Sequence, residues 1–197
     1  TSNTPLEIID KLQRGEEEKF KITIPEGFTF AEILNRFAAL DFPEYEQEKL
    51  ESEIYDQLTE LELDLTFNEE VLDSGEIFPA EGFIIPTTYN FPMSYDEANI
   101  AEDLIEYFTE QRLPLLEEAA ADRGFSAYEL LIIASLIEEE GKLDDENKII
   151  ASVIYNRLEQ GMPLQLDATV QYVLPERTAR VLYSDLVIES PYNTYQI

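Results

Sequence analysis

At four places along the chain, a Ser or Thr followed three residues later by a Glu stands just before a segment with a helical pattern. In this capping box the hydroxyl accepts from a backbone N–H in the first turn, and the Glu side chain bonds back to the N-cap N–H. The four signals predict helices that begin after Thr29, Thr66, Ser94 and Ser126. They commit much of the chain to helical structure.

Two other segments have the character of β-structure. Residues 19–24, KFKITI, alternate polar and apolar side chains and are predicted to form a strand. Residues 81–91, EGFIIPTTYNF, are extended and aromatic, and Pro86 indicates an edge or a strand end. With helices predicted from Thr29 to about residue 40 and over 44–61, these strands predict a small strand-helix-helix-strand unit over about residues 18–90.

The rest of the chain is predicted to be mainly helical. The signal at Ser94 opens a helix that should run to about residue 122 with a kink at Pro114. Further helices are expected over 127–140 and about 145–160, each followed by Gly, and a short one over 4–15 opens the chain. The predicted fold class is therefore α+β.

Composition narrows the chemistry. The 197 residues include no Cys and no His, which excludes thiol nucleophiles, disulfides and Ser-His-Asp catalysis within the chain. The 43 Asp and Glu against 13 Lys and Arg give a net charge of −30, which repels phosphate backbones, so no nucleic-acid partner is expected. We also expect no cofactor and no metal, because neither a Gly-rich nucleotide loop nor a calcium loop is present. No run approaches the roughly 20 apolar residues of a membrane span.

Glu138 is the carboxylate that the helix pattern singles out. It continues an apolar stripe formed by Ala127, Leu130, Leu131 and Ala134. The helix over 127–140 is apolar nearly all round, which predicts a buried helix. Desolvation and the neighbouring Glu139 and Glu140 would favour the protonated carboxyl that a general acid needs. Spacing alone leaves open the alternative that Glu138, one of three consecutive Glu residues, points to water.

Two later segments gather polar groups. Residues 162–172, MPLQLDATVQY, hold Gln165, Asp167 and Thr169 at alternating positions, although Asp167 could serve only as the N-cap of a helix over 168–174. Residues 191–195, PYNTY, could form a turn or present amides and tyrosine edges to a sugar.

Three blocks match a known family in the correct order: ASLIEEEG (134–141), IIASVIYNRLEQGMPLQLDATVQY (149–172) and SPYNTY (190–195). TIPEGFTFAEI (23–33) and EGFIIPTTYNF (81–91) add to the match in the first half. In these blocks, and over essentially its whole length, the chain resembles the endolytic murein transglycosylases, the MltG or YceG-like family.

The resemblance implies an α+β fold with two functional parts. Residues 18–92 would form a small LysM-like β-α-α-β subdomain, residues 93–197 a mainly helical transglycosylase catalytic domain, and residues 1–17 the end of a preceding segment. The family's usual sequence continues past the last block, so the catalytic domain is expected to be truncated at its C-terminus. The family also implies a single-pass anchor and a place at the extracytoplasmic face of the bacterial cell membrane.

Carried over position by position, the family's catalytic Glu falls on Glu138, and Glu140 matches the second acid of the motif in a supporting role. The residues expected to line or brace the glycan groove are Gln165, Asp167, Thr169, Tyr192, Asn193 and Tyr195. The chain departs from the usual form at Ala168, where the family has Pro, and at Thr87, where it has an acid.

The implied activity is cleavage of the MurNAc–GlcNAc β-1,4 bond within nascent peptidoglycan strands, giving 1,6-anhydroMurNAc ends and terminating strand elongation. Its partners would be the glycan strand and, at the membrane, cell-wall synthases. Two alternatives stay open: a muramidase-type hydrolase with Asp167 as second carboxylate, and a non-catalytic peptidoglycan-binding or scaffold module.

Overall fold

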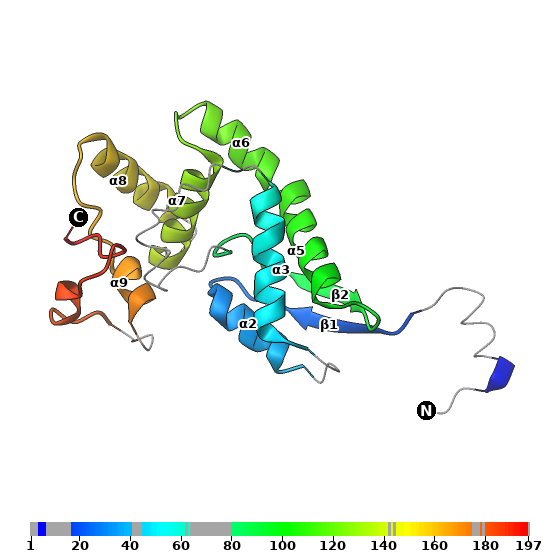
Figure 1. Ribbon diagram of the computed structural model, residues 1–197. Helices are drawn as coiled ribbons and strands as arrows, with labels where there is room; N and C mark the ends of the chain where they lie inside the picture. Colours follow the sequence, from blue (N-terminus) through cyan, green and yellow to red (C-terminus); the bar gives the residue numbers. More distant parts are fainter. Residues whose placement is uncertain are drawn as a thin grey trace. The chain divides into compact units, whose positions relative to one another are not determined.

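The computed structural model describes residues 4–6, 17–40, 45–61, 63, 80–141, 143, 145–174, 178 and 180–196. The architecture is α+β (Figure 1). The chain divides into two compact units: unit 1 comprises residues 1–61 and 83–109, and unit 2 comprises residues 62–82 and 110–197. The segment of unit 2 that precedes residue 83 thus interrupts unit 1 in the sequence.

Unit 1 contains a two-stranded antiparallel sheet. β1 (Lys19–Thr23) pairs with β2 (Thr88–Pro92), in a register that places Lys19 opposite Pro92 and Thr23 opposite Thr88. The strand predicted at 19–24 is confirmed. Of the segment 81–91 only its last part is a strand, and Pro86 lies in a bend two residues before β2. That position suits a residue without a backbone N–H to donate to the ladder.

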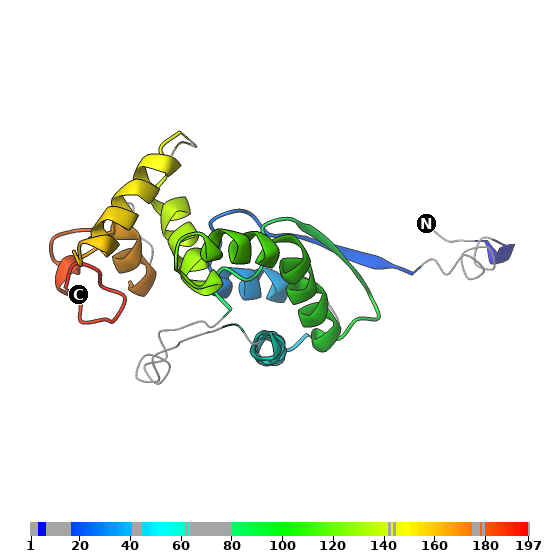
Figure 2. The same ribbon diagram turned by 90° about the horizontal axis from the view of Figure 1, so that it is seen from above.

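Unit 1 also contains three helices, α2 (Phe30–Ala38), α3 (Gln47–Glu60) and α5 (Glu97–Gln111), of which α2 and α3 contact each other (Figures 1 and 2). The Thr29 capping box is confirmed, because Glu32 N–H donates to Thr29 Oγ1 over 3.3 Å and Thr29 N–H donates to Glu32 Oε2 over 2.8 Å. Aromatic rings join helix to sheet, with the centroids of Phe37 and Phe91 6.2 Å apart. These buried rings account for how so acidic a chain keeps a core.

The capping box predicted at Ser94 and Glu97 is wrong. Asp96 provides the cap of α5 instead, since its Oδ1 accepts from the N–H of Asn99 over 3.0 Å. Glu97 is drawn away to α3, where its carboxylate accepts from Glu46 N–H over 2.9 Å and from Lys49 Nζ over 2.8 Å. The capping box fails because Asp96, which is nearer to the helix start, caps α5, and because Glu97 bonds to α3 instead of to Ser94.

The single kinked helix predicted from Ser94 to about residue 122 is also wrong. α5 ends at Gln111, and a separate helix, α6 (Leu113–Ala121), begins after Arg112, whose φ of −122° is not helical. Pro114 lies in the first turn of α6. A missing N–H costs nothing there, because the first N–H groups of a helix have no partner within it.

Unit 2 is built around α7 (Ala127–Glu140), which contacts α6, α8 (Asn147–Glu159) and α9 (Asp167–Val173). A short 3₁₀ helix, η1 (Asp185–Val187), follows. The core of the unit is small and aliphatic. It comprises Ala120, Leu130, Ile133, Ile154 and Leu166. The Ser126 capping box that opens α7 is confirmed by both of its hydrogen bonds.

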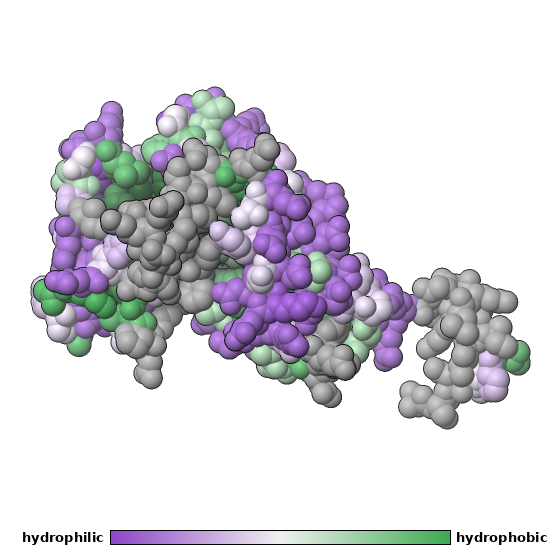
Figure 3. Space-filling view, viewed as in Figure 1, coloured by the Kyte–Doolittle hydropathy of each residue, from purple (hydrophilic) through white to green (hydrophobic). Residues whose placement is uncertain are grey.

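The surface reflects the composition. Around α3 the visible atoms are mostly hydrophilic, and the exposed positions of that helix include Glu48, Asp56 and Glu60 (Figure 3). Hydrophobic atoms show over the segment of η1, where Leu182 and Val187 are exposed. Within the described ranges no helix has both the length and the apolar character needed to cross a membrane. The helix predicted over 67–73 and most of the one over 4–15 lie outside the described residues.

Candidate active site

Glu138 lies in the last turn of α7, and its side chain is exposed. The buried residues of α7 are Leu130 and Ile133, while Ile132 and Ala134 are exposed. The expectation of a helix buried nearly all round, with a desolvated Glu138, is therefore wrong. Glu138 follows Ile133 by five positions. At 3.6 residues per turn, its side chain therefore lies roughly 140° around the helix axis from that of the buried Ile133.

Glu140, at the very end of α7, joins that helix to α9. Its Oε1 accepts from the backbone N–H of Ala168 over 3.1 Å, and its side chain is partly buried. Ala168 is in the first turn of α9, where backbone N–H groups lack intrahelical partners. A carboxylate from one helix thus satisfies a donor of another.

Asp167 is the first residue of α9, and the N-cap is Leu166, which forms no side-chain capping bond. The alternative that Asp167 serves as the N-cap is therefore wrong. Its Oδ1 accepts from the Tyr195 hydroxyl over 2.6 Å. The side chain of Asp167 is exposed.

Thr194 holds the turn formed by residues 191–196, which we call the C-terminal turn, against the start of α9. Its Oγ1 accepts from Leu166 N–H over 3.0 Å and lies 3.0 Å from Thr169 Oγ1, and its carbonyl accepts from Gln165 N–H over 3.0 Å. The sequence pattern did not single out Thr194. The only feature of the sequence that points to Thr194 is its place inside the PYNTY block, where the aromatic and amide side chains beside it are the ones typical of sugar binding.

Asn193 braces this turn from within. It is fully buried, and its Nδ2 donates to the carbonyls of Leu186 over 3.0 Å and Ile188 over 2.8 Å. Its Oδ1 accepts from the N–H of Tyr195 over 3.0 Å. Every polar atom of this amide is thereby used inside the protein.

Tyr192 belongs to an aromatic group rather than to the α9 turn. Its ring centroid lies 5.1 Å from that of Tyr172, whose hydroxyl donates to Glu81 Oε2 over 3.0 Å. Burial and then the charge of Glu81 raise the pKa of Tyr128 to about 12, and the same two causes raise the pKa of Tyr172 further. The sequence does not predict this contact of Glu81, because the only feature that points to Glu81 is its place in the block 81–91, which resembles the family.

Gln165 has an unusual backbone. Its φ of 51° is in the left-handed region, where it is the sole non-glycine among the residues that the structure describes. This conformation costs an ordinary side chain about 1–2 kcal/mol. The bond from its N–H to the Thr194 carbonyl helps to hold it. The side chain of Gln165 is exposed.

The surroundings of Tyr195 raise the pKa of its hydroxyl. Burial, the hydrogen bond to Asp167, and the charges of Asp167 and Glu140 raise the pKa of Tyr195 to about 12, and Arg157 opposes them. The hydroxyl is thus protonated at neutral pH and can donate to Asp167. Glu140, Asp167, Thr169, Thr194 and Tyr195 form one group, which we call the α9 cluster.

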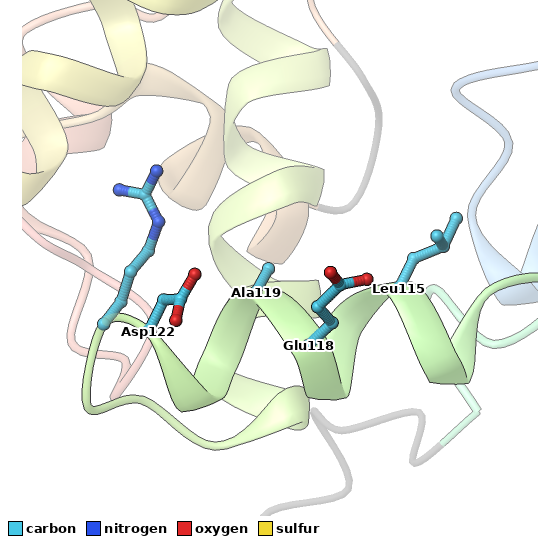
Figure 4. A pocket seen from close by; sticks show the side chains of 5 residues that line it. Leu115, Glu118, Ala119 and Asp122 are labelled. Atoms are coloured by element: carbon cyan, nitrogen blue, oxygen red, sulfur yellow. The ribbon is translucent and has the colours of Figure 1, made fainter.

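Glu138 stands two residues before Glu140 on the helix end that meets the α9 cluster. Among the described residues, no three carboxylates gather as a metal ion would require. A hollow elsewhere in unit 2 is lined by Leu115, Glu118, Ala119, Asp122 and Arg123, all from α6 or the turn after it (Figure 4). It includes no residue of the α9 cluster.

The whole chain matches one family of known proteins. The sequence profile of the YceG-like family matches residues 1–197. The chain belongs to the YceG-like family. A protein of Bacillus subtilis (strain 168) named endolytic murein transglycosylase is 36% identical over 197 residues, covering 96% of this chain and 53% of that relative. A Streptococcus pneumoniae (strain R6) protein of the same name is 29% identical over 216 residues, covering 96% of this chain and 38% of its own length.

This YceG-like chain therefore spans about half the length, or less, of these curated relatives. A crystal structure of a yceG-like protein from Listeria monocytogenes has the same fold, with a TM-score of 0.77 and 28% sequence identity. The match covers 100% of this chain and 66% of that one. The α+β architecture is thus shared with a solved member of the family.

Proposed function

We propose that this chain acts as an endolytic peptidoglycan lytic transglycosylase in which Glu138 is the acid and base. The observation that carries the proposal is the match, over 96% of the chain, to relatives named endolytic murein transglycosylase. The chain's lack of Cys and His fits a reaction that needs one carboxylate and no thiol, imidazole or metal.

The proposed chemistry has two proton transfers. Glu138 in its acid form protonates the oxygen of the MurNAc–GlcNAc β-1,4 bond as the bond breaks, and positive charge develops at the MurNAc anomeric carbon. The Glu138 carboxylate then takes the proton of the MurNAc C6 hydroxyl, whose oxygen bonds to the anomeric carbon. The products are a 1,6-anhydroMurNAc end and a free GlcNAc 4-hydroxyl, and Glu138 is protonated again.

The exposure of Glu138 is compatible with this role. A glycan strand lying over the end of α7 would remove water from the carboxyl, and desolvation favours its protonated form. Substrate binding would then supply the environment that the free chain lacks. An exposed acid also suits an endolytic enzyme, because a strand without a nearby end must be able to enter from the side.

The other family positions have supporting roles in the proposal. Gln165 and Asp167 present exposed side chains and would contact the glycan. Tyr192 and Tyr195 would border it with their rings. Glu140, Thr169 and Asn193 would brace the groove, since their polar atoms bond within the protein.

We further propose that residues 18–92 are a LysM-like subdomain and that residues 93–197 belong to a transglycosylase catalytic domain. The names of the relatives support action on the cell wall, hence outside the cytoplasm. A single-pass anchor and contact with cell-wall synthases belong to the same proposal.

The test uses mass spectrometry of muropeptides after nascent glycan is treated with the protein and with its Glu138→Gln variant. We expect 1,6-anhydro ends with the wild type and a loss of at least about 100-fold with Glu138→Gln, within the range by which acid–base catalysis contributes. The matched control is Glu139→Gln, which removes the same charge from the neighbouring exposed position.

Two other outcomes would favour the alternatives. Reducing ends in place of anhydro ends, lost on Asp167→Asn as well as on Glu138→Gln, would identify a muramidase-type hydrolase. Binding of the glycan without turnover, unaffected by Glu138→Gln, would identify a scaffold module. Equal amounts of anhydro ends from both proteins would remove Glu138 from the mechanism.

A further inference from the structure

The junction between α7 and α9 is made by a side chain of one helix and a backbone donor of the other. Glu140 Oε1 accepts from the backbone N–H of Ala168 over 3.1 Å. This N–H belongs to the first turn of α9, so it has no carbonyl partner within the helix. The bond depends on a residue at 168 that has an N–H, and Pro, which the family usually has there, would remove the donor, so this bond belongs to the departure of this chain from the usual form.

We propose that Glu140 is a positioning residue, which fixes the first turn of α9 against the end of α7 through the Ala168 N–H and so sets where Asp167 stands relative to the helix that carries Glu138. This inference deepens the proposed function and rests on it. What this inference adds to the proposed function is the hydrogen bond from Ala168 N–H to Glu140, which links α7 and α9 directly.

The first turn of α9 is held from two sides. On one side, Glu140 bonds to Ala168. On the other, the C-terminal turn bonds to Leu166 through Thr194 Oγ1, over 3.0 Å, and to Asp167 through the Tyr195 hydroxyl, over 2.6 Å. Asp167 lies between these attachments, since Glu140 bonds to the residue after it and the Tyr195 hydroxyl bonds to its carboxylate.

The charge of Glu140 adds to this arrangement. A hydrogen bond to an ionised acceptor is roughly twice as strong as one between neutral groups. The charge also adds, after burial and Asp167, to the causes that raise the pKa of Tyr195. Gln at 140 would retain an oxygen acceptor without the charge, and Ala would remove both, so the two variants separate bond from charge.

The alternative is that the Glu140–Ala168 bond only stabilises the fold. A stabilising bond alters the folded fraction, whereas a positioning bond alters the turnover of molecules that remain folded. The experiment therefore measures kcat/KM for anhydro-end formation well below the unfolding temperature of each variant. The set comprises Glu140→Ala, Glu140→Gln, Ala168→Pro and the double variant Glu140→Ala with Ala168→Pro.

We expect Glu140→Ala to lower kcat/KM about tenfold, the factor that about 1.4 kcal/mol of lost interaction produces. Glu140→Gln should recover most of that loss. In the Ala168→Pro background, Glu140→Ala should have less than about a twofold further effect, because the donor is already gone. Glu139→Ala, at the neighbouring position of α7, is the matched control: it also removes a charge near Glu138 but leaves the bond to Ala168, so it should lower kcat/KM clearly less than Glu140→Ala does.

Amide hydrogen exchange by NMR tests the same bond without any turnover. Exchange of the Ala168 N–H should accelerate by about tenfold in Glu140→Ala and not in Glu139→Ala. Two results would overturn the inference: an unchanged Ala168 exchange rate, or a loss of kcat/KM from Glu140→Ala that is as large in the Ala168→Pro background as in the wild type. If Ala168→Pro does not fold, the exchange rate and the Gln variant still decide.

The two proposals fail in different ways. If Glu138→Gln abolishes anhydro ends while every Glu140 variant keeps wild-type kcat/KM, the function stands and the positioning role is wrong. If the wild type makes no anhydro ends, the proposed function is wrong, and with it any positioning role in that reaction, whatever the exchange rates show.

Discussion

At the scale of single residues, Glu97 shows how this acidic chain uses a carboxylate inside unit 1. Its exposed fraction is 4%, and it accepts from Lys49 Nζ and from the Glu46 N–H. Burial opposes its ionisation, but the hydrogen bonds from Lys49 and from backbone N–H groups outweigh it and hold the pKa of Glu97 below its usual value. A buried charge of this kind is stable only with its partners in place.

The first prediction concerns acid stability. Because the pKa of Glu97 is lowered in the folded protein, its stabilising effect is full above the unfolded value, about 4.3, and is lost as pH falls through the folded value. Glu97→Gln should lower the free energy of unfolding at pH 7 by about 1–3 kcal/mol and reduce its further decline below about pH 4.3. Urea denaturation at several pH values measures both effects.

The control is Glu48→Gln, at an exposed position of α3. It removes an equal charge and should leave the steepness of the acid decline nearly unchanged. A wild-type curve and a Glu97→Gln curve that run parallel from pH 7 to about pH 3, below the usual Glu pKa, would contradict the prediction.

The sequence nominates residues for the candidate site but does not predict how they contact one another. The motif blocks indicated Glu138, Asp167 and the C-terminal turn, but no periodicity indicated that Tyr195 bonds to Asp167 across 28 positions. The apolar character of α7 suggested a desolvated Glu138, yet most of those apolar side chains are only partly buried. Exposure depends on which neighbours pack against a helix, and spacing does not contain that information.

At the scale of elements, the start of α7 is fixed by its capping box. Ser126 Oγ accepts from Glu129 N–H over 3.1 Å, and Glu129 Oε2 accepts from Ser126 N–H over 2.7 Å. α7 contacts α6, α8 and α9, so its register sets the packing of the unit around it. A local feature of four residues thereby contributes to the placing of three other helices.

The second prediction tests that cap. Ser126→Ala removes the acceptor for the Glu129 N–H and should lower the free energy of unfolding by about 1 kcal/mol. The matched control is Ser152→Ala, within α8, where the hydroxyl donates to the Lys148 carbonyl in an already bonded helix. That substitution should be neutral or slightly stabilising, because Ala is the better helix former. Thermal unfolding followed by circular dichroism gives both values, and a loss at Ser152 equal to that at Ser126 would contradict the assignment.

Helices and strands were predictable where local signals had no competitor. The boxes at Thr29 and Ser126 form as expected, since both partners lie within one turn. The box at Ser94 fails because Glu97 finds Lys49 and Glu46, which are about fifty positions away in the sequence. A Pro within a helical pattern predicts a kink. In the structure α5 ends at Gln111 instead, and Pro114 lies in the first turn of the next helix, α6.

At the scale of the whole molecule, charge dominates. A net charge of −30 over 197 residues means that each acid on the surface has mostly repulsive neighbours. Such self-repulsion favours expanded states over compact ones. The aromatic and aliphatic cores of the two units oppose it.

The third prediction follows from screening. The Debye length falls from about 30 Å at 0.01 M salt to about 8 Å at 0.15 M, so added NaCl weakens repulsion between surface acids. The urea concentration at the midpoint of unfolding should therefore rise between about 0.01 and 0.15 M NaCl. An equal osmolarity of an uncharged solute serves as the control, and a midpoint that falls with salt would mean that attractive pairs such as Lys49 with Glu97 outweigh the repulsion.

The pairing of β1 with β2 has a consequence for how the protein is made. Thr23 and Thr88, which face each other at one end of the sheet, are 65 positions apart in the sequence. At about 5–20 residues per second, a ribosome completes the second strand roughly 3–13 s after the first. During that interval the apolar face of β1 has no sheet partner, and the residues of α2 and α3 are made in the meantime. The sheet therefore forms only after α2 and α3, which lie between the two strands in the sequence, have been made.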